Sequence, residues 1–323
     1  MKKEILILAI SLITISIYAQ PVPNVEENIP HLMTFGNTAE PSWGDDDFSQ
    51  AFFFLVPKSF NQQVFIRVFD PDIGGQIDEI AGAWNTRCSY EVFGGKGCWS
   101  DDDARETSPI GNYKSGVLLA TKIFSENPRY DNNWFTFGPF DPAQGEYVDM
   151  FDGYVFKVIC EGVAGDDGNM YNYYLSTSGT ENIPIEGANA FAYEYSFRMH
   201  NDPFEVSHIY PYIDEETVSV KLSNFDWDTD GNIIVVSVAR QGQKVGVSAE
   251  DVWAQDELKV MDEEHKTSWD FQFVKSKKPV VKNNNVVVNV RNQYNETVAF
   301  YTSPIGGVPK YKYSISATKK SPN

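Results

Sequence analysis

Alternation of apolar and polar residues with a period of two limits the fold of this chain more than any other feature. In "AFAYEYSFRM", residues 190–199, every second residue from Phe191 to Phe197 is aromatic, and the residues between them are small or polar. The segment "YKYSIS", residues 311–316, repeats this pattern. A period of two places alternate side chains on opposite faces of an extended chain, so the pattern indicates half-buried strands of antiparallel sheets.

Further segments have the composition of strands and are separated by clusters of Gly, Pro, Asn and Asp. They are residues 51–56, 63–69, 117–124, 170–176, 217–222, 232–238, 268–274, 285–291 and 297–302. Many short strands, 22 Phe and 17 Tyr residues and polar turns predict an all-β protein made of antiparallel β-sandwiches. The one short helix that we expect is "SAEDVWAQDEL", residues 248–258, with Ser248 as its N-cap.

The N-terminus has the layout of a secretory signal peptide, residues 1–19. Lys2 and Lys3 precede an apolar run at 5–18, and Ala19 offers a small residue before the polar "QPVPNVEEN". The run is too short for a comfortable transmembrane helix, which needs about 20 apolar residues. An uncleaved N-terminal anchor is the alternative. We expect the chain to be secreted or periplasmic, with association to the cell surface left open, and not inserted in a membrane after signal cleavage.

Charge is distributed unevenly along the chain and suggests two domains. The formal net charge is −19, and residues 20–205 hold 29 acidic and 10 basic residues, against 15 and 14 in residues 206–323. Prolines punctuate the chain where the charge density changes. We therefore predict an acidic β-sandwich at 20–205 and a second, immunoglobulin-like β-sandwich at 206–323. The acidic field repels nucleic acid and anionic lipid and attracts cations, although it also serves solubility alone.

The three cysteines suit an oxidising compartment with few disulfides. Cys88 and Cys98 enclose "SYEVFGGKG", whose glycines would let the chain fold back and bring the sulfurs together. We therefore expect a Cys88–Cys98 disulfide, although spacing alone does not fix connectivity. Cys160 ends the strand-like "GYVFKVIC" and is expected to be a buried free thiol.

The most specific acidic pattern is "DWDTDG", residues 226–231. Asp226, Asp228 and Asp230 alternate before Gly231, as in the first half of a D-x-D-x-D-G calcium loop. Calcium takes six to eight oxygen ligands, and alternate side chains of a tight loop converge on one point. A helical EF-hand is excluded because its twelfth position is Ser237 here and a strand follows. The stretch resembles the D-x-D-x-D-G loops of β-rich extracellular modules, which implies a calcium site; a solvated, Asp-rich hairpin turn is the alternative.

A second candidate calcium loop, "DPDIGGQIDE", follows a predicted strand. Asp70, Asp72, Asp78 and Glu79 flank its Gly-Gly turn. Carboxylates gathered at one end of a sandwich repel one another by several kcal/mol at low effective dielectric, and this repulsion favours a bound cation. The layout resembles the tip loops of calcium-dependent C2-like sandwiches. Acidic runs at 45–47, 101–103 and 165–169 are either partner loops or exposed turns, and together the acidic loops predict bound Ca²⁺.

Trp84, Trp99 and Trp134 lie in turn-like contexts and are the candidate ligand-binding residues. Aromatic platforms beside acids and amides are typical of carbohydrate sites, whereas burial in the core is the alternative for such large side chains. The sequence has no zinc spacing of histidines, nucleophile elbow, phosphate loop or dinucleotide fingerprint. A glycosidase needs only two facing carboxylates, so an enzyme stays open, with Glu194 as a candidate acid.

Together these features predict an exported, non-catalytic, calcium-stabilised β-sandwich protein that acts as a binding or adhesion module, with a glycan or a surface protein as its partner. One alternative is a carbohydrate-active hydrolase or an accessory protein of polysaccharide use. Another is a structural component of a cell-surface assembly that pairs through exposed strand edges.

Overall fold

The all-β prediction is confirmed. The computed structural model describes residues 21–40, 48–106, 112–249 and 251–309, and these form β-strands, turns and short 3-10 helices without an α-helix. The expected signal peptide, the acidic run at 45–47 and the strand at 311–316 lie outside the described residues. Every sheet pairing between the described strands is antiparallel, as the period of two requires.

The longest sheet of the described chain has nine strands, in the order β18–β15–β21–β12–β2–β10–β4–β7, with β1 beside β10. Their bounds are Pro21–Val22 (β1), His31–Phe35 (β2), Val64–Phe69 (β4), Trp134–Phe140 (β7), Gly168–Ser176 (β10), Glu194–Arg198 (β12), Ser219–Phe225 (β15), Ala254–Lys259 (β18) and Asn285–Asn292 (β21). This sheet joins strands from both ends of the sequence. β12 is the junction, because it pairs with β2 on one side and with β21 on the other.

A seven-stranded sheet has the order β22–β11–β3–β9–β5–β6, with β8 beside β9, among the described residues. Its strands are Ser49–Pro57 (β3), Arg87–Gly94 (β5), Val117–Phe124 (β6), Glu146–Val148 (β8), Gly153–Ala164 (β9), Asn189–Ala192 (β11) and Phe300–Tyr301 (β22). A four-stranded sheet contains Val206–Ile209 (β13), Asp270–Lys275 (β20), Gly231–Val236 (β16) and Gln241–Val245 (β17). Tyr212–Ile213 (β14) pairs with Thr267–Ser268 (β19). The 3-10 helices are Val25–Glu27 (η1), Pro142–Gln144 (η2), Asp149–Phe151 (η3) and Asp262–Glu264 (η4).

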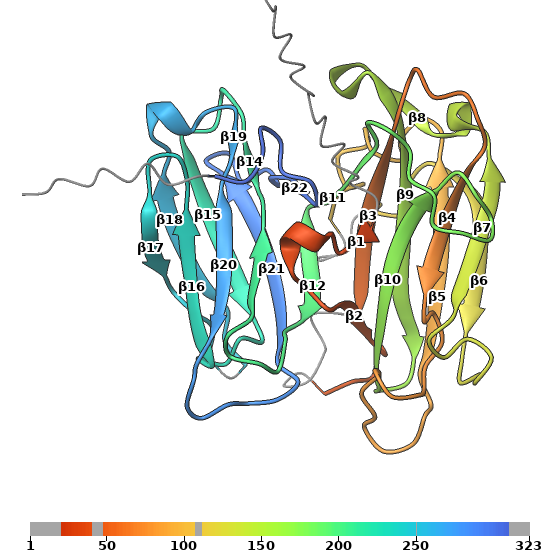
Figure 1. Cartoon of the computed structure of the whole chain (residues 1–323), viewed down its shortest axis with the longest axis horizontal. Helices are drawn as coiled ribbons and strands as arrows, with labels where there is room; N and C mark the ends of the chain where they lie inside the picture. Colours follow the sequence, from red (N-terminus) through yellow and green to blue (C-terminus); the bar gives the residue numbers. More distant parts are fainter. Residues whose placement is uncertain (1–20, 41–47, 107–111, 250, 310–323) are drawn as a thin grey trace, which may run out of the picture.

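The nine-stranded sheet is the layer that the seven- and four-stranded sheets share. Tyr195 and Phe197 lie two residues apart on β12 and so point to the same face. Tyr195 meets Phe52 of β3 edge to face at 5.1 Å between ring centroids, and Phe197 meets Phe273 of β20 at 5.2 Å. Figure 1 shows the strands of residues 49–176 on one side and those of residues 206–275 on the other, with β2, β12 and β21 between them. One large hydrophobic core runs through all three sheets.

The aromatic segment 190–199 is divided into two strands rather than forming one. β11 ends at Ala192 in the seven-stranded sheet, and β12 begins at Glu194 in the nine-stranded sheet. Phe191 and Tyr193 therefore enter a smaller core on the outer face of the seven-stranded sheet, whereas Tyr195 and Phe197 enter the large core. The alternation identified the strand correctly but not the change of sheet, because both halves bury their aromatic residues.

The predicted helix at 248–258 is wrong. Ala254–Lys259 is β18, which pairs with β15 over six residues. The Ser248 hydroxyl, expected to cap a helix, instead accepts a hydrogen bond of 2.9 Å from the backbone N–H of Trp227. Pairing with an available sheet edge outweighs the weak local helix propensity of this segment.

The predicted division after residue 205 stays a prediction. Strand β12, which precedes it, pairs with β21 through five residues. Strand β22, which follows it, pairs with β11. Strands that precede residue 205 and strands that follow it thus pair with one another in two of the sheets.

Candidate functional site

The loop that follows β4 is held against the turn that precedes β7. Phe69, the last residue of β4, is opposite Trp134, the first residue of β7. Asp70 adopts a left-handed conformation (φ 52°), and its backbone N–H donates to the carbonyl of Asn133 at 2.9 Å. This strained backbone turns the Asp70 side chain away from the path of the strand, toward the turn at residues 127–133.

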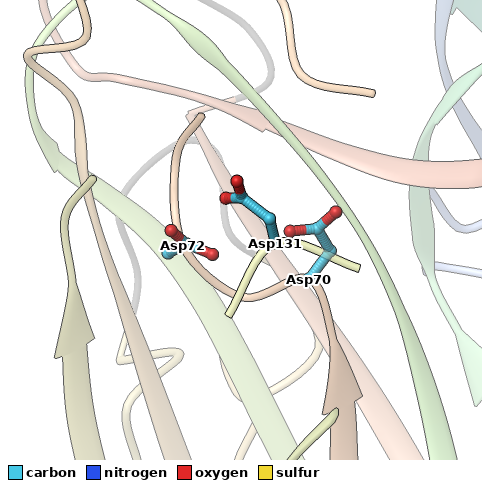
Figure 2. Close-up of side chains that lie close together, drawn as sticks. All are labelled: Asp70, Asp72 and Asp131. Carbon is cyan, nitrogen blue, oxygen red and sulfur yellow. The ribbon is translucent and has the colours of Figure 1, made fainter. Parts of the chain in front are cut away.

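Three carboxylates meet at this point. Asp70, Asp72 and Asp131 each offer an oxygen, and these oxygens all lie within 4.8 Å of one another. Figure 2 shows the three side chains grouped, with Asp131 placed between the other two. Gly75 comes close to the same place, since a Cβ built on it would lie 3.1 Å from the carboxyl carbon of Asp131. The loop glycine, at φ 72°, thus allows the backbone to close over the cluster.

Asp70 and Asp72 are both only 1% exposed, and one oxygen of each, Oδ1, has no hydrogen-bond partner among the described residues. The other Asp72 oxygen, Oδ2, accepts a 2.8 Å hydrogen bond from the backbone N–H of Asn127. Burial, and to a smaller extent the charge of Asp131, raises the pKa of Asp70 to about 7 and that of Asp72 to about 6. Buried carboxylate oxygens without partners are costly, and a bound cation would lower this cost.

The mutual repulsion of the cluster is large on the scale of protein stability. Two unit charges at this separation repel by roughly 3 to 4 kcal/mol at an effective dielectric constant of 20. Glu126 adds another negative charge near Asp72. The three acidic side chains present only oxygen atoms, with no His or Cys in the group. Hard oxygen donors favour Ca²⁺ or Mg²⁺ over zinc or copper, and a flexible set of loop carboxylates suits calcium best.

Asp78 and Glu79, predicted as ligands in the same loop, have other partners. Both Asp78 oxygens accept backbone hydrogen bonds, at 2.8 Å from Gly74 and 2.7 Å from Met170, and burial raises the pKa of Asp78 well above its ordinary value. Glu79 forms an ion pair with Arg198 of β12. These two acids therefore fasten the far end of the loop to β10 and β12, while Asp70 and Asp72 belong to the cluster.

Asp131 was missing from the sequence-based ligand set. It stands about sixty positions from Asp70 in "YDNNW", where a single acid among amides carries no metal-binding pattern. The only signal that could have found it is the pairing of β4 with β7, which brings residues 69 and 134 opposite each other. A motif of neighbouring residues cannot reveal a ligand residue that strand pairing brings in from a distant part of the chain.

The other predicted calcium loop, residues 226–231, forms a tight turn between β15 and β16. Asp226 and Asp228 have positive φ angles of 59° and 51°, and with Asp230 they face residues 281–285 across a hollow of about 130 Å³. Asp230 accepts a hydrogen bond from the Asn284 amide. The carboxylates of this turn do not gather into a three-acid group within the described residues, as those of the Asp70 cluster do. Calcium binding there stays a prediction.

The acidic run at 165–169 has a structural use for one of its members. Asp167 is completely buried, and its carboxylate accepts hydrogen bonds from the backbone N–H groups of Ala81, Asn85 and Thr86 at 2.8 to 3.1 Å. It therefore anchors the loop at 80–86, which carries Trp84, to the end of β10.

The three tryptophans proposed as ligand-binding residues lie in different surroundings. Trp134 packs against Phe69 at 5.4 Å, beneath the guanidinium of Arg67 at 5.0 Å. Trp84 is half-buried in the loop at 80–86. Trp99 lines a groove of about 660 Å³. Of the three, Trp99 is thus the one that combines an aromatic ring with room for a ligand.

The predicted Cys88–Cys98 disulfide is absent from the structure. All three cysteines are buried free thiols. Cys88 lies in the large core together with Cys160, whereas Cys98 lies in the smaller core on the outer face of the seven-stranded sheet, with its thiol 3.3 Å from the Val155 carbonyl. The seven-stranded sheet separates the two sulfurs. Cys88 belongs to β5 and lies in the large core on one face of the sheet, whereas Cys98 follows the turn after β5 and lies in the smaller core on the other face. The free Cys160 thiol agrees with the sequence-based expectation.

Comparison with known proteins places the chain in no family, since no protein-family model and no curated protein matches it. A search of the described residues for a helix long and apolar enough to cross a membrane finds none.

Proposed function

We propose that this is an exported, non-catalytic binding module whose fold is stabilised by one calcium ion held by Asp70, Asp72 and Asp131. The observation that carries this proposal is the pair of buried carboxylates, Asp70 and Asp72, each with an oxygen that lacks a protein partner. A cation bound there would satisfy these oxygens and remove the repulsion among the three acids.

Export is supported by the N-terminal pattern of two lysines, an apolar run and a small residue, and by the strongly acidic composition. In extracellular fluids calcium is abundant, and sites with dissociation constants of about 0.1 to 1 mM are occupied there. A three-carboxylate site on loops needs no higher affinity to stabilise the fold in that environment.

A binding role rather than catalysis is supported by how the groove uses its acids. Glu106 is held by both terminal nitrogens of Arg291, each at 3.1 Å. One Asp214 oxygen accepts hydrogen bonds from the backbone N–H groups of Glu216 and Thr217 and from the Thr217 hydroxyl. Acids that are committed to such structural bonds are poorly placed to exchange protons with a substrate.

Calorimetric unfolding of a chain that begins at Gln20 tests the calcium proposal. With a dissociation constant of about 0.1 to 1 mM, calcium at about 10 mM should add roughly 1.4 to 2.7 kcal/mol. For a protein of this size we expect the melting temperature to rise by about 2 to 4 °C, relative to chelator at matched ionic strength.

Asp72→Asn removes one charge from the cluster and should abolish most of this rise. The same substitution raises metal-free stability, because it relieves repulsion, and this increase separates loss of a ligand from damage to the fold. Asp262→Asn is the matched control, since Asp262 is exposed at η4, and it should keep the full calcium response. A wild-type melting temperature that is the same in calcium and in chelator would refute the proposal.

A further inference from the structure

The groove that contains Trp99 lies where the two groups of strands meet at one end of the molecule. Its walls come from five parts of the chain: the turn at 99–106, η3, Tyr193, residues 212–217, and residues 292 and 295–305. Figure 1 shows β14 and β22 at that end, between the two groups of strands. A volume of about 660 Å³ falls in the range of about 300 to 1,000 Å³ that is usual for small-molecule sites.

The groove has an aromatic floor fixed by its own contacts. The Trp99 indole N–H donates to the Tyr193 hydroxyl at 2.8 Å, and the Trp99 ring meets Phe151 at 5.3 Å. Tyr301 meets Tyr212 edge to face at 6.2 Å. These contacts hold the rings without ligand, so little conformational entropy is lost when a ligand binds.

Three tyrosines, Tyr193, Tyr212 and Tyr301, line this space. Among the described residues neither the Tyr212 nor the Tyr301 hydroxyl forms a hydrogen bond, although Tyr301 is only 5% exposed. The Tyr193 hydroxyl accepts from Trp99 and keeps its proton to donate. Burial raises the pKa of Tyr193 and Tyr301, so these hydroxyls stay neutral donors at physiological pH.

The charges of the groove disfavour anionic ligands. Its lining includes the acids Asp102, Glu106, Asp214 and Glu296 and the single base Arg105, in a protein of net charge −19, so an anion is repelled. Part of the attraction for a cation is balanced within the protein, because Arg291 pairs with Glu106 at 3.1 Å and the guanidinium of Arg105 lies 4.3 Å from the Trp99 ring and 5.6 Å from the Tyr193 ring. A neutral ligand rich in hydroxyls fits what remains.

We infer that this groove binds a neutral saccharide unit of a glycan, through the hydroxyls of Tyr193, Tyr212 and Tyr301 and apolar contact with the aromatic floor. The inference rests on the proposed function as a binding module and gives its ligand class. Sugar rings combine hydroxyls, which pair with the tyrosines, with C–H faces that pack on aromatic side chains.

Isothermal titration of the full chain in calcium tests this inference. The neutral probes are cellohexaose, mannohexaose, xylohexaose and laminarihexaose, and the charged probes are hexagalacturonate and hexalysine. We expect at least one neutral oligosaccharide to bind with a dissociation constant of about 1 mM or below, and the charged probes not to bind. Binding of none of the neutral probes, or preferential binding of a charged one, would overturn the saccharide assignment.

The site is tested by Tyr301→Phe and Tyr212→Phe, which remove only hydroxyl oxygens and leave the rings. Each should weaken binding by about three- to tenfold, the usual effect of one hydrogen bond. Tyr294→Phe is the matched control, because Tyr294 is 71% exposed and outside the groove, and it should bind as the wild type does. Saccharide binding that is unchanged in both groove variants would place the site elsewhere and refute the inference.

The same samples distinguish this inference from the calcium proposal. If calcium raises the melting temperature but no oligosaccharide binds, the groove assignment fails and the calcium site stands. If an oligosaccharide binds in a groove-dependent manner but calcium has no effect on melting, the calcium site fails and the groove assignment stands.

Discussion

Glu27 makes the stability of this protein depend on pH in a way that one substitution can isolate. The side chain lies in η1 and is completely buried. Its Oε2 atom accepts hydrogen bonds from the Asn24 backbone N–H at 2.6 Å and the Tyr195 hydroxyl at 3.1 Å, while Oε1 has no partner among the described residues. Burial raises its pKa from 4.5 to about 8, with a small further rise from Glu26. Glu27 is therefore mainly protonated in the folded protein at neutral pH.

The sign of the effect follows from which state, folded or unfolded, holds the proton on Glu27. Between pH 4.5 and 8 the folded state holds a proton on Glu27 that the unfolded state has released, so stability falls as pH rises. Between pH 5 and pH 8 this loss amounts to about 3.5 kcal/mol. The neighbouring Tyr195 and Tyr210 stay neutral across this range, because burial raises their pKa. Glu27→Gln keeps the shape of the side chain and both hydrogen bonds but does not titrate, so the variant should not lose this stability between pH 5 and pH 8.

Urea unfolding at pH 5, 6.5 and 8 measures the effect. The free energy of unfolding of Glu27→Gln minus that of the wild type should increase by about 3 to 4 kcal/mol from pH 5 to pH 8. Glu26→Gln changes the adjacent, exposed glutamate, and its difference from the wild type should stay within about 0.5 kcal/mol throughout. A Glu27→Gln difference that is the same at pH 5 and pH 8 would refute a raised pKa at this buried site.

Two further predictions concern the interior. In urea unfolding, Glu264→Gln should lower the free energy of unfolding by about 3 kcal/mol, because it leaves the buried Arg240 guanidinium, 2.8 Å from a Glu264 oxygen, without its counter-charge. Glu263 is exposed, so the control Glu263→Gln should change the free energy of unfolding by less than about 0.5 kcal/mol. The thiols of Cys88, Cys98 and Cys160 should resist an alkylating reagent in the folded protein and all react after unfolding without reductant, as counted by mass spectrometry; a disulfide-linked peptide would contradict the free thiols of the structure.

The strands could be predicted from sequence because their signal is local. The segment at 117–124 is β6 with the same bounds, and the segments at 51–56, 63–69 and 285–291 lie within or beside β3, β4 and β21. In each, a run of β-branched, aromatic and other apolar residues bounded by turn residues is a signal of neighbouring residues alone. The prediction of a helix that begins at Ser248 failed because the pairing of Ala254–Lys259 with β15 depends on residues thirty to forty positions away, which no local pattern reveals.

The candidate metal site was only half predictable. Asp70 and Asp72 stand in one loop and could be recognised together, but Asp131 joins them through the pairing of β4 with β7. Asp78 and Glu79 look the same in sequence as the two clustered aspartates. Their different partners, backbone N–H groups for Asp78 and Arg198 for Glu79, become visible only when β10 and β12 are in place.

A crystal structure of the protein grown in about 10 mM calcium, with anomalous difference density recorded at long wavelength, tests the calcium proposal most directly. The account predicts one peak with carboxylate oxygens of Asp70, Asp72 and Asp131 at about 2.3 to 2.6 Å from it. Density without a peak between these side chains, with Asp70 and Asp72 bonded only to water or to each other, would contradict it.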